Sequence, residues 1–371
     1  MEERGYQVFA PEEDEPDKQS DVFFNDHMIE NRDISEAAFK VASKIIQSDE
    51  IHTCDALSAS GIRGFRFNEF SDHLVLNDVN PNAVESIEKG LEANGIEAEV
   101  TNKDANIILT ENRNRFHLID VDPFGPFTTF LDSTARAANH DSFVGLTATD
   151  NAVPAGSYKK TCMRRYGSTP LKESFMHETA LRIYIHEAFR NFARFDKCFE
   201  PKLAFQHRHY CRVIGRVTES KKRTNQQLEN TGFLSFCPDC RWRVLEKEKR
   251  DECELCGHGV ANAGPLWIGK FSDRRFTEKV LEEMPAEWED GREIVERVDS
   301  EAEIITPFYD LHELCSNMGV SSPKRDPVIE KIHEKGYPIS RTHFSPTGFR
   351  TDAPLDDIKE AITEVRKERA G

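Results

Sequence analysis

The first half of the chain alternates between short apolar runs and longer amphipathic stretches. The amphipathic stretches predict helices at residues 35–47, with Ser35 as the expected cap, and at residues 81–95. The apolar runs predict strands at residues 51–57, 73–79, 97–105, 116–122 and 142–150. Strands separated by helices of this length are joined by right-handed crossovers, so the pattern predicts a doubly wound parallel sheet in an α/β fold.

The pattern changes in the second half of the chain. An amphipathic helix is predicted at residues 175–195 and a late strand at residues 211–220. Residues 221–230 are polar and predict a linker or an exposed loop. Beyond them, helical patterns are predicted at residues 276–284, 307–319 and 355–368.

This organisation predicts two domains. The first covers residues 1–225 and begins with an extended arm in its first twenty residues, which are polar and lack periodicity. The second covers residues 226–371 and is expected to be a smaller α+β domain.

Charge changes the picture because it is unevenly distributed. The chain of 371 residues is 38% hydrophobic and 31% charged, as in ordinary globular proteins, with a formal net charge of −17. Between Asn151 and Asn225, however, sixteen Lys or Arg residues stand against six acids. Such a block can attract nucleic acid despite the acidic total, although composition alone equally allows a solvated helix face. The acidic N-terminus has no signal-peptide core and no apolar run is long enough to span a membrane, so a cytoplasmic location is expected.

Four of the nine cysteines are spaced as metal ligands. Cys237 and Cys240 form one C-x2-C pair, and Cys253 and Cys256 form a second. Four thiolates around one ion make the closed tetrahedral site of a structural zinc ribbon, which leaves no open position for catalysis. His258, just past the second pair, is predicted to be a turn residue and not a ligand.

Small residues and acids follow the predicted strands, where a cofactor would lie. The segment CDALSASGIRG after the first strand is rich in small residues but is not G-x-G-x-x-G, which disfavours a nicotinamide cofactor. Asp55, Asp78 and Asp104 end three successive strands. Each alone is typical of a turn or a helix cap, but in this order they favour a nucleoside-containing cofactor, with Asp78 at the ribose and Asp104 with Ala105 at the adenine edge.

The fourth strand ends in the sequence LIDVDPFGPF. Its D-P-F-G resembles the (D/N)-P-P-(Y/F) loop of S-adenosylmethionine-dependent amino-methyltransferases. An exocyclic amine on a base is a weak nucleophile, so an acceptor beside it must orient it and take its proton. Asp122 can be that acceptor, the carbonyl of Pro123 a second one, and Phe124 the face on which the base stacks.

Segments along the whole chain together resemble the tRNA (guanine(26)-N2)-dimethyltransferase family of the archaeal and eukaryotic type. They are VFFNDHMIENRDIS, DALSASGIRG, NDVNP, DVDPFGPF, TDNAVPAGSY, the CPDC and CELC pair, and SRTHFSPTGFRTDA. The resemblance implies a Rossmann-like class I methyltransferase domain that binds S-adenosylmethionine, and a smaller zinc-containing domain. It also implies tRNA as the partner, with no membrane and no obligate protein partner.

The resemblance assigns roles to individual residues. Contacts to S-adenosylmethionine are expected from Arg32, Arg63, Asp78, Asp104 and Ala105. Asp122 is expected to be the catalytic acid of the loop that holds Pro123 and Phe124. Phe124 and Phe23 are expected to clamp the guanine, although Phe24 stands equally close in the sequence.

The expected reaction is direct transfer of one or two methyl groups to N2 of guanine 26, turned out of its stack. Lys159, Lys160, Arg164 and Arg165 are expected to contact the RNA. Two alternatives stay open: an amino-methyltransferase of another RNA or DNA base, and a zinc-ribbon RNA-binding protein without catalytic activity.

Overall fold

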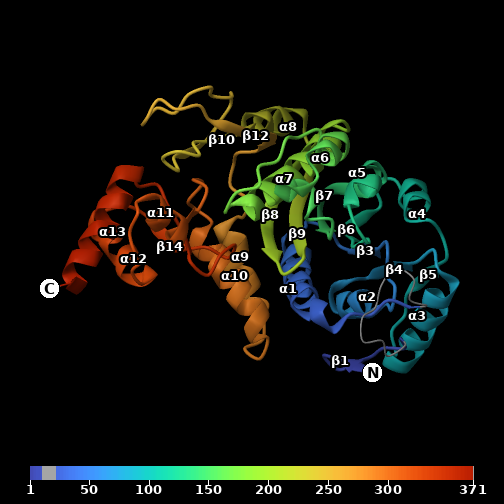
Figure 1. Cartoon of the computed structure of the whole chain (residues 1–371). Helices are drawn as coiled ribbons and strands as arrows, with labels where there is room; N and C mark the ends of the chain where they lie inside the picture. Colours follow the sequence, from blue (N-terminus) through green and yellow to red (C-terminus); the bar gives the residue numbers. More distant parts are fainter. Residues whose placement is uncertain (11–21, 371) are drawn as a thin grey trace.

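The computed structural model describes residues 1–10 and 22–370 (Figure 1). Residues 11–20 of the predicted N-terminal arm lie outside the described residues. Residues 1–10 do not form an extended arm, because β1 (Glu2–Glu3) and β2 (Tyr6–Gln7) pair as a hairpin. The backbone of Gln7 bonds the side chain of Asn94 in both directions, at 2.8 and 2.9 Å, and this docks the hairpin on the body of the protein.

The five predicted parallel strands form one side of a seven-stranded sheet with the order β5-β4-β3-β6-β7-β9-β8, from the edge strand β5 to β7. They are β3 (His52–Asp55), β4 (His73–Asn77), β5 (Glu99–Thr101), β6 (Phe116–Val121) and β7 (Ala138–Ala148). The late strand β9 (Tyr210–Glu219) runs antiparallel to β7, and β8 (Lys197–His207) runs antiparallel to β9. β8 was not predicted, because Pro201 and Lys202 interrupt its apolar pattern where the register shifts.

Helices cover both faces of this sheet. Successive residues of a strand point to opposite faces, so Leu74 and Leu76 of β4 join one apolar core and Val75 joins the other. The first core is closed by α1 (Ile29–Ile45), α2 (Ile62–Phe67), α3 (Pro81–Asn94), α9 (Arg274–Glu283) and α10 (Glu289–Glu301). The second is closed by α4 (Ala105–Glu111), α5 (Leu131–Ala137) and α7 (Met176–Ala193).

Two local predictions were wrong. α1 begins at Ile29, earlier than expected, and Ser35 lies inside it, donating to Asn31 Oδ1 at 3.1 Å. The polar residues of this first part are buried in ion pairs and therefore break the apolar pattern. The expected linker contains α8 (Lys221–Gln227), capped by Ser220, which accepts from the Arg223 N–H at 3.3 Å.

Besides α9 and α10, which pack on the first core, the C-terminal part forms two small sheets and the helices α11 (Leu311–Asn317), α12 (Arg325–Glu334) and α13 (Leu355–Ala370). One sheet has the order β11 (Arg243–Glu246), β10 (Thr231–Phe236), β12 (Ala261–Trp267), and the other the order β13 (Tyr309–Asp310), β15 (Gly348–Thr351), β14 (Ile339–Arg341). Figure 1 shows α11, α12 and α13 on the opposite side of the molecule from α3 and β5. Within residues 1–10 and 22–370, no helix has both the length and the apolar character that crossing a membrane requires.

A buried network of charges joins the two parts. Arg350 of β15 donates to Glu178 of α7 at 2.9 and 3.0 Å and to Glu301 of α10 at 2.8 Å. Arg182 pairs with the same Glu178 at 2.8 Å, and His343 bonds Glu301. Burial alone would raise the pKa of Glu301, but Arg350 and His343 lower it to about 2. Buried charges need such complete pairing, and breaking it is strongly destabilising.

Candidate active site

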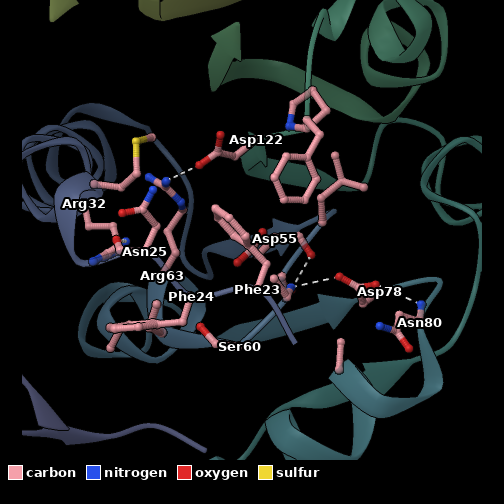
Figure 2. A pocket seen from close by; sticks show the side chains of 18 of the residues that line it. Phe23, Phe24, Asn25, Arg32, Asp55, Ser60, Arg63, Asp78, Asn80 and Asp122 are labelled. Atoms are coloured by element: carbon pink, nitrogen blue, oxygen red, sulfur yellow. Dashed lines mark hydrogen bonds and ion pairs between the residues drawn. The ribbon is translucent and has the colours of Figure 1, made fainter. Parts of the chain in front are cut away.

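A cavity of about 650 Å³ opens at the carboxyl ends of β3, β4 and β6 (Figure 2). From β3 the chain continues to β4 on one side, whereas β6 pairs with β3 on the other, so the strand order reverses here. Open α/β sheets bind their ligands at such a reversal. The volume is also within the range of ligand pockets, about 300–1,000 Å³.

The floor of the cavity is the small-residue loop after β3, which includes Ser58, Ala59 and Ser60. Asp78, after β4, holds this loop in place, because its carboxylate accepts from the N–H groups of Ala59 and Asn80, both at 2.8 Å. Burial raises the pKa of Asp78, although these N–H donors oppose the rise. The structure therefore places the predicted ribose-binding acid in the cavity, where it also ties two strand ends together.

Gly64 explains how closely the following helix can approach. A Cβ at this position would lie 2.1 Å from Cδ2 of Leu76 in β4, so any other residue would require the buried Leu76 side chain to shift. α2 therefore packs directly on the sheet and brings Arg63 to the cavity.

Asp55 lies at the base of the cavity and is only 1% exposed. Burial raises its pKa to about 8; the Asp120 carboxylate adds to the rise, and the Arg63 guanidinium opposes it. Neither of its carboxylate oxygens has a hydrogen-bond partner of normal geometry among the described residues, although the Leu57 N–H is near enough to oppose the rise in pKa as well. A buried carboxyl group without such a partner indicates a place for a ligand that carries a donor or a positive charge.

Arg63 organises the acids around the cavity. Its Nε is 3.2 Å from Asp120, its Nη2 donates to Asp122, and its Nη1 donates to Asn31 and Ser35 at 3.3 and 3.2 Å. Burial opposes its charge, but the surrounding carboxylates raise the pKa of Arg63. The side chain predicted to contact a cofactor thus also fixes the predicted catalytic acid.

Thr149, directly after β7, fixes the loop of the predicted catalytic acid. Its hydroxyl accepts from the Gly125 N–H at 2.7 Å, and its own N–H donates to the Gly125 carbonyl at 3.0 Å. Gly125 has a φ of +90°, a conformation that favours glycine. The segment TDNAVPAGSY was noted in the sequence, but this contact requires knowing that β6 and β7 are neighbours.

Two aromatic rings meet at the mouth of the cavity. Phe124 is 53% exposed and contacts Phe23 edge to face, with ring centroids 4.5 Å apart and planes at 79°. The structure therefore brings together the two rings that were expected to clamp a base. Because they touch, a base between them requires one ring to rotate aside.

Phe24 faces a different group. Its ring lies beneath the guanidinium of Arg32, 5.2 Å from the centroid, and Arg32 also donates to the Asn25 carbonyl at 3.1 Å. Glu3 of the N-terminal hairpin holds Arg32 with both carboxylate oxygens, one at 2.8 Å. No sequence pattern indicated Glu3, because its contact joins residues that are distant along the chain.

Asp104 and Ala105 are not among the residues that line the cavity. Asp104 caps α4 by accepting from the Asn106 N–H at 2.8 Å. Their contact with a cofactor therefore remains a prediction. Val79 and His209 line the cavity without having been predicted.

The basic block is only partly on the surface. Arg182, Lys197 and Arg212 are buried. Four cations of α6 (Lys159–Tyr166) are exposed, namely Lys159, Lys160, Arg164 and Arg165. This helix lies beside the cavity, because Asp150, the neighbour of Thr149, bonds Arg165 at 3.0 Å and the hydroxyl of Tyr166 at 2.8 Å.

The four predicted metal ligands converge in the C-terminal part. All their sulfur atoms lie within 4.8 Å of one another, and the pairs Cys237–Cys256 and Cys240–Cys253 are each 3.5 Å apart. A tetrahedral zinc ion with bonds of about 2.3 Å separates its sulfurs by about 3.8 Å. The arrangement therefore fits a four-thiolate zinc site. The imidazole of His258 faces Asp239 at 3.4 Å and is exposed.

Known proteins resemble this chain over nearly its whole length. A family model described as N2,N2-dimethylguanosine tRNA methyltransferase matches residues 7–363. A tRNA (guanine(26)-N(2))-dimethyltransferase of Methanosphaera stadtmanae is 36% identical over 383 aligned residues, which cover 100% of this chain and 98% of that protein. Its counterpart in Methanothermobacter thermautotrophicus is 36% identical and covers 94% of each. The structure of Trm1 from Pyrococcus horikoshii with S-adenosyl-L-methionine matches with a TM-score of 0.85 and 28% identity, covering 96% of this chain and 97% of that one.

Proposed function

This chain belongs to the N2,N2-dimethylguanosine tRNA methyltransferase family, and on that premise we propose how its residues carry out the reaction. The protein is a tRNA guanine-N2 dimethyltransferase that uses S-adenosylmethionine. The observation that carries the proposal is the meeting of Asp122, Arg63 and two aromatic rings at one cavity mouth.

The acids of the cavity suit a positively charged cofactor. S-adenosylmethionine supplies a methyl group on a cationic sulfur, which makes that methyl electrophilic. Asp55, at the base, is proposed to face the charged methionine part, since it is buried without a partner of normal geometry. Asp78 is proposed to accept from the ribose hydroxyls, because its two carboxylate oxygens can accept more hydrogen bonds than the backbone N–H groups supply.

Asp122 is proposed to be the proton acceptor for the guanine amine. Arg63 holds one of its carboxylate oxygens (Figure 2), which fixes the carboxyl group in the cavity and leaves the other oxygen to accept from the amine. The carbonyl of Pro123 is proposed to accept the second amine hydrogen, while Phe124 and Phe23 stack on the base. Fixing the amine at the right distance and angle can supply about 7–11 kcal/mol of the barrier to such a transfer. Thr149 supports this geometry through Gly125.

The exposed cations of α6 are proposed to contact tRNA phosphates. Replacing Lys159, Lys160 and Arg164 together by Ala should weaken tRNA binding. The slope of the logarithm of the binding constant against the logarithm of the salt concentration should become less steep, by up to about three released counterions. The affinity for S-adenosylmethionine should not change. The matched control replaces three exposed cations on α8, namely Lys221, Lys222 and Arg223. If both triple variants lost the same tRNA affinity, α6 would not be a specific contact site for the RNA.

A zinc ion is proposed at the four cysteines, with a structural role. Cys237 and Cys253 are part of the apolar core of the C-terminal part, so the metal would hold that core together. We also propose that the boundary between a methyltransferase domain and a family-specific domain falls near residue 225. A cytoplasmic location, where tRNA is processed, completes the proposal.

The decisive experiment follows labelled methyl groups from S-adenosylmethionine into an unmodified tRNA transcript. We expect wild type to label it, Asp122→Asn to lose most of the labelling while still binding S-adenosylmethionine, and a transcript with adenine at position 26 to stay unlabelled. Labelling of the adenine transcript would indicate another target base. Binding of RNA without any labelling by wild type would favour the RNA-binding protein.

A further inference from the structure

Glu3 is a buried acid in the N-terminal hairpin. It is 6% exposed, whereas its neighbour Glu2 in the same strand is exposed. Its carboxylate accepts from Nε and Nη2 of Arg32, at 2.8 Å for Nε, and from Nη1 of Arg66 at 3.0 Å. Burial alone would raise the pKa of Glu3, but the two arginines lower it overall. Glu3 is therefore held as a carboxylate beside Arg32, which lines the cavity.

The hairpin that carries Glu3 is fixed from several sides. Besides its bonds to α3, Arg4 donates to both carboxylate oxygens of Asp33 in α1, at 2.6 and 3.2 Å. The Arg4 guanidinium also lies 5.3 Å from the ring centroid of Trp288, and Val8 is part of the first apolar core. A hairpin held in this way gives Glu3 a defined position relative to α1.

Arg32 has more hydrogen-bond donors than its protein partners use. A guanidinium has five N–H donors. Glu3 and the Asn25 carbonyl take three of them, at Nε, Nη2 and Nη1. Within the described residues, one donor on each terminal nitrogen is left for a ligand. Arg63, the other arginine of the cavity, uses all three of its side-chain nitrogens on protein partners. Arg32 is therefore the better placed of the two to bind an anion.

We propose that Glu3 is a positioning residue that holds Arg32 ready for the carboxylate of S-adenosylmethionine, an inference that rests on the proposed function of the cavity. This carboxylate is the anionic group of the cofactor, and arginine binds carboxylates through paired N–H bonds. Glu3 is not among the lining residues, so it does not itself touch the cofactor. It acts by fixing the guanidinium, with the Phe24 ring beneath, before the cofactor binds. Such preorganisation reduces the freedom that is lost on binding.

The test compares two ligands that differ in the methionine part. S-adenosylhomocysteine keeps the carboxylate and the amine of the cofactor, whereas 5′-methylthioadenosine lacks both. Competition against labelled S-adenosylmethionine measures the affinity of the full chain for each ligand. Glu3→Gln sets an amide donor against an arginine donor, so Arg32 loses its fixed orientation. We expect this variant to bind S-adenosylhomocysteine about tenfold more weakly and 5′-methylthioadenosine as wild type does.

The kinetic constants should separate in the same way. In Glu3→Gln, the KM for S-adenosylmethionine should rise about tenfold, while kcat and the affinity for tRNA stay near their wild-type values. Glu2→Gln is the matched control, because it changes an exposed acid of the same strand, and it should bind both ligands as wild type does.

A second variant covers the case in which Glu3→Gln folds poorly. Asn94→Ala releases the hairpin from α3 without removing an ion pair. It should weaken the binding of S-adenosylhomocysteine by about threefold and leave that of 5′-methylthioadenosine unchanged. Unchanged binding of S-adenosylhomocysteine by the folded variant, or an equal loss for both ligands, would overturn the proposal.

Arg32→Met separates this inference from the proposed function. It should lose at least as much affinity for S-adenosylhomocysteine as Glu3→Gln does. If Arg32→Met binds this ligand normally while wild type methylates tRNA, the inference fails and the proposed function stands. If wild type neither binds S-adenosylmethionine nor methylates tRNA, both fail.

Discussion

Replacing Asp55 by Asn tests the electrostatics of the cavity. Burial, assisted by the Asp120 carboxylate, raises the pKa of Asp55 from 3.8 to about 8 in the folded chain. Between these two pH values, Asp55 keeps a proton in the folded state that it loses in the unfolded state. The unfolded state thus binds fewer protons, and the free energy of unfolding must fall as the pH rises through this window. Outside the window, Asp55 has the same charge in both states and contributes no slope.

The size of the effect follows from one proton. A difference of one bound proton gives a slope of about 1.4 kcal/mol per pH unit, or at most about 6 kcal/mol over the whole window. Between pH 5 and pH 7 the limit is about 2.7 kcal/mol. Asn has nearly the same shape as Asp and no titratable proton, so the Asp55→Asn variant should lack this part of the pH dependence.

Urea unfolding of both proteins at pH 5, 6, 7 and 8 measures the effect directly. The stability of the variant relative to wild type should grow by about 1 kcal/mol or more per pH unit from pH 5 to pH 7. Other titrating groups are common to both proteins and cancel. Asp49→Asn, a change at an exposed acid, should leave the pH dependence unaltered. If the curves of wild type and Asp55→Asn run parallel, Asp55 is ionised in the folded enzyme and the reasoning fails.

Cofactor binding gives a second test of whether Asp55 is protonated in the folded protein. A positively charged ligand in the cavity lowers the pKa of a nearby carboxyl group. S-adenosylmethionine binding at pH 7 should therefore release up to one proton from wild type and none from Asp55→Asn. Calorimetric titrations in two buffers with different ionisation enthalpies measure this number.

Three further changes have expected outcomes. Thr149→Val removes the acceptor for the Gly125 N–H. We expect kcat to fall about tenfold, which corresponds to about 1.4 kcal/mol of lost positioning. The KM for S-adenosylmethionine should not change, and Thr149→Ser, which keeps the hydroxyl, should keep the activity. Cys240→Ser should lower the zinc content, measured by atomic absorption, and the melting temperature; an unchanged zinc content would exclude the four-cysteine site. Arg350→Met leaves two buried carboxylates short of a partner and should destabilise the chain by about 3–5 kcal/mol in urea unfolding, whereas Arg297→Met, at an exposed pair, should change the stability by about 1 kcal/mol or less.

The sequence predicted the parts of the site that depend on strand order. The carboxyl ends of parallel strands meet at one edge of a sheet, so the acids after four predicted strands could be expected together. Asp55, Asp78 and Asp122 do line one cavity, whereas Asp104 is not among its lining residues. The aromatic pair of Phe23 and Phe124 was found through the resemblance to a family, since no local pattern joins residues so far apart.

Other parts of the site depend on contacts that no local pattern encodes. Asp120 lies inside a fully buried strand, where an acid is unexpected until Arg63 and Arg212 are seen beside it. Glu3 reaches Arg32 only because the N-terminal hairpin folds back over α1. The start of α1 was missed for the same reason, since ion pairs replace apolar residues on its buried side.

The charge network around Arg350 has a consequence for how the enzyme meets its substrate. A hinge motion between the two parts of the chain would separate Arg350 from Glu178. Both charges would then lose their partner while still largely shielded from water, which is costly. The pairing therefore opposes such a hinge, so we expect the fit to the tRNA to come from loops and side chains such as Phe23 and from the RNA itself. If guanine 26 leaves its stack as proposed, it does so at the expense of the RNA's own structure, and the ease with which a given tRNA deforms at that junction becomes part of substrate selection.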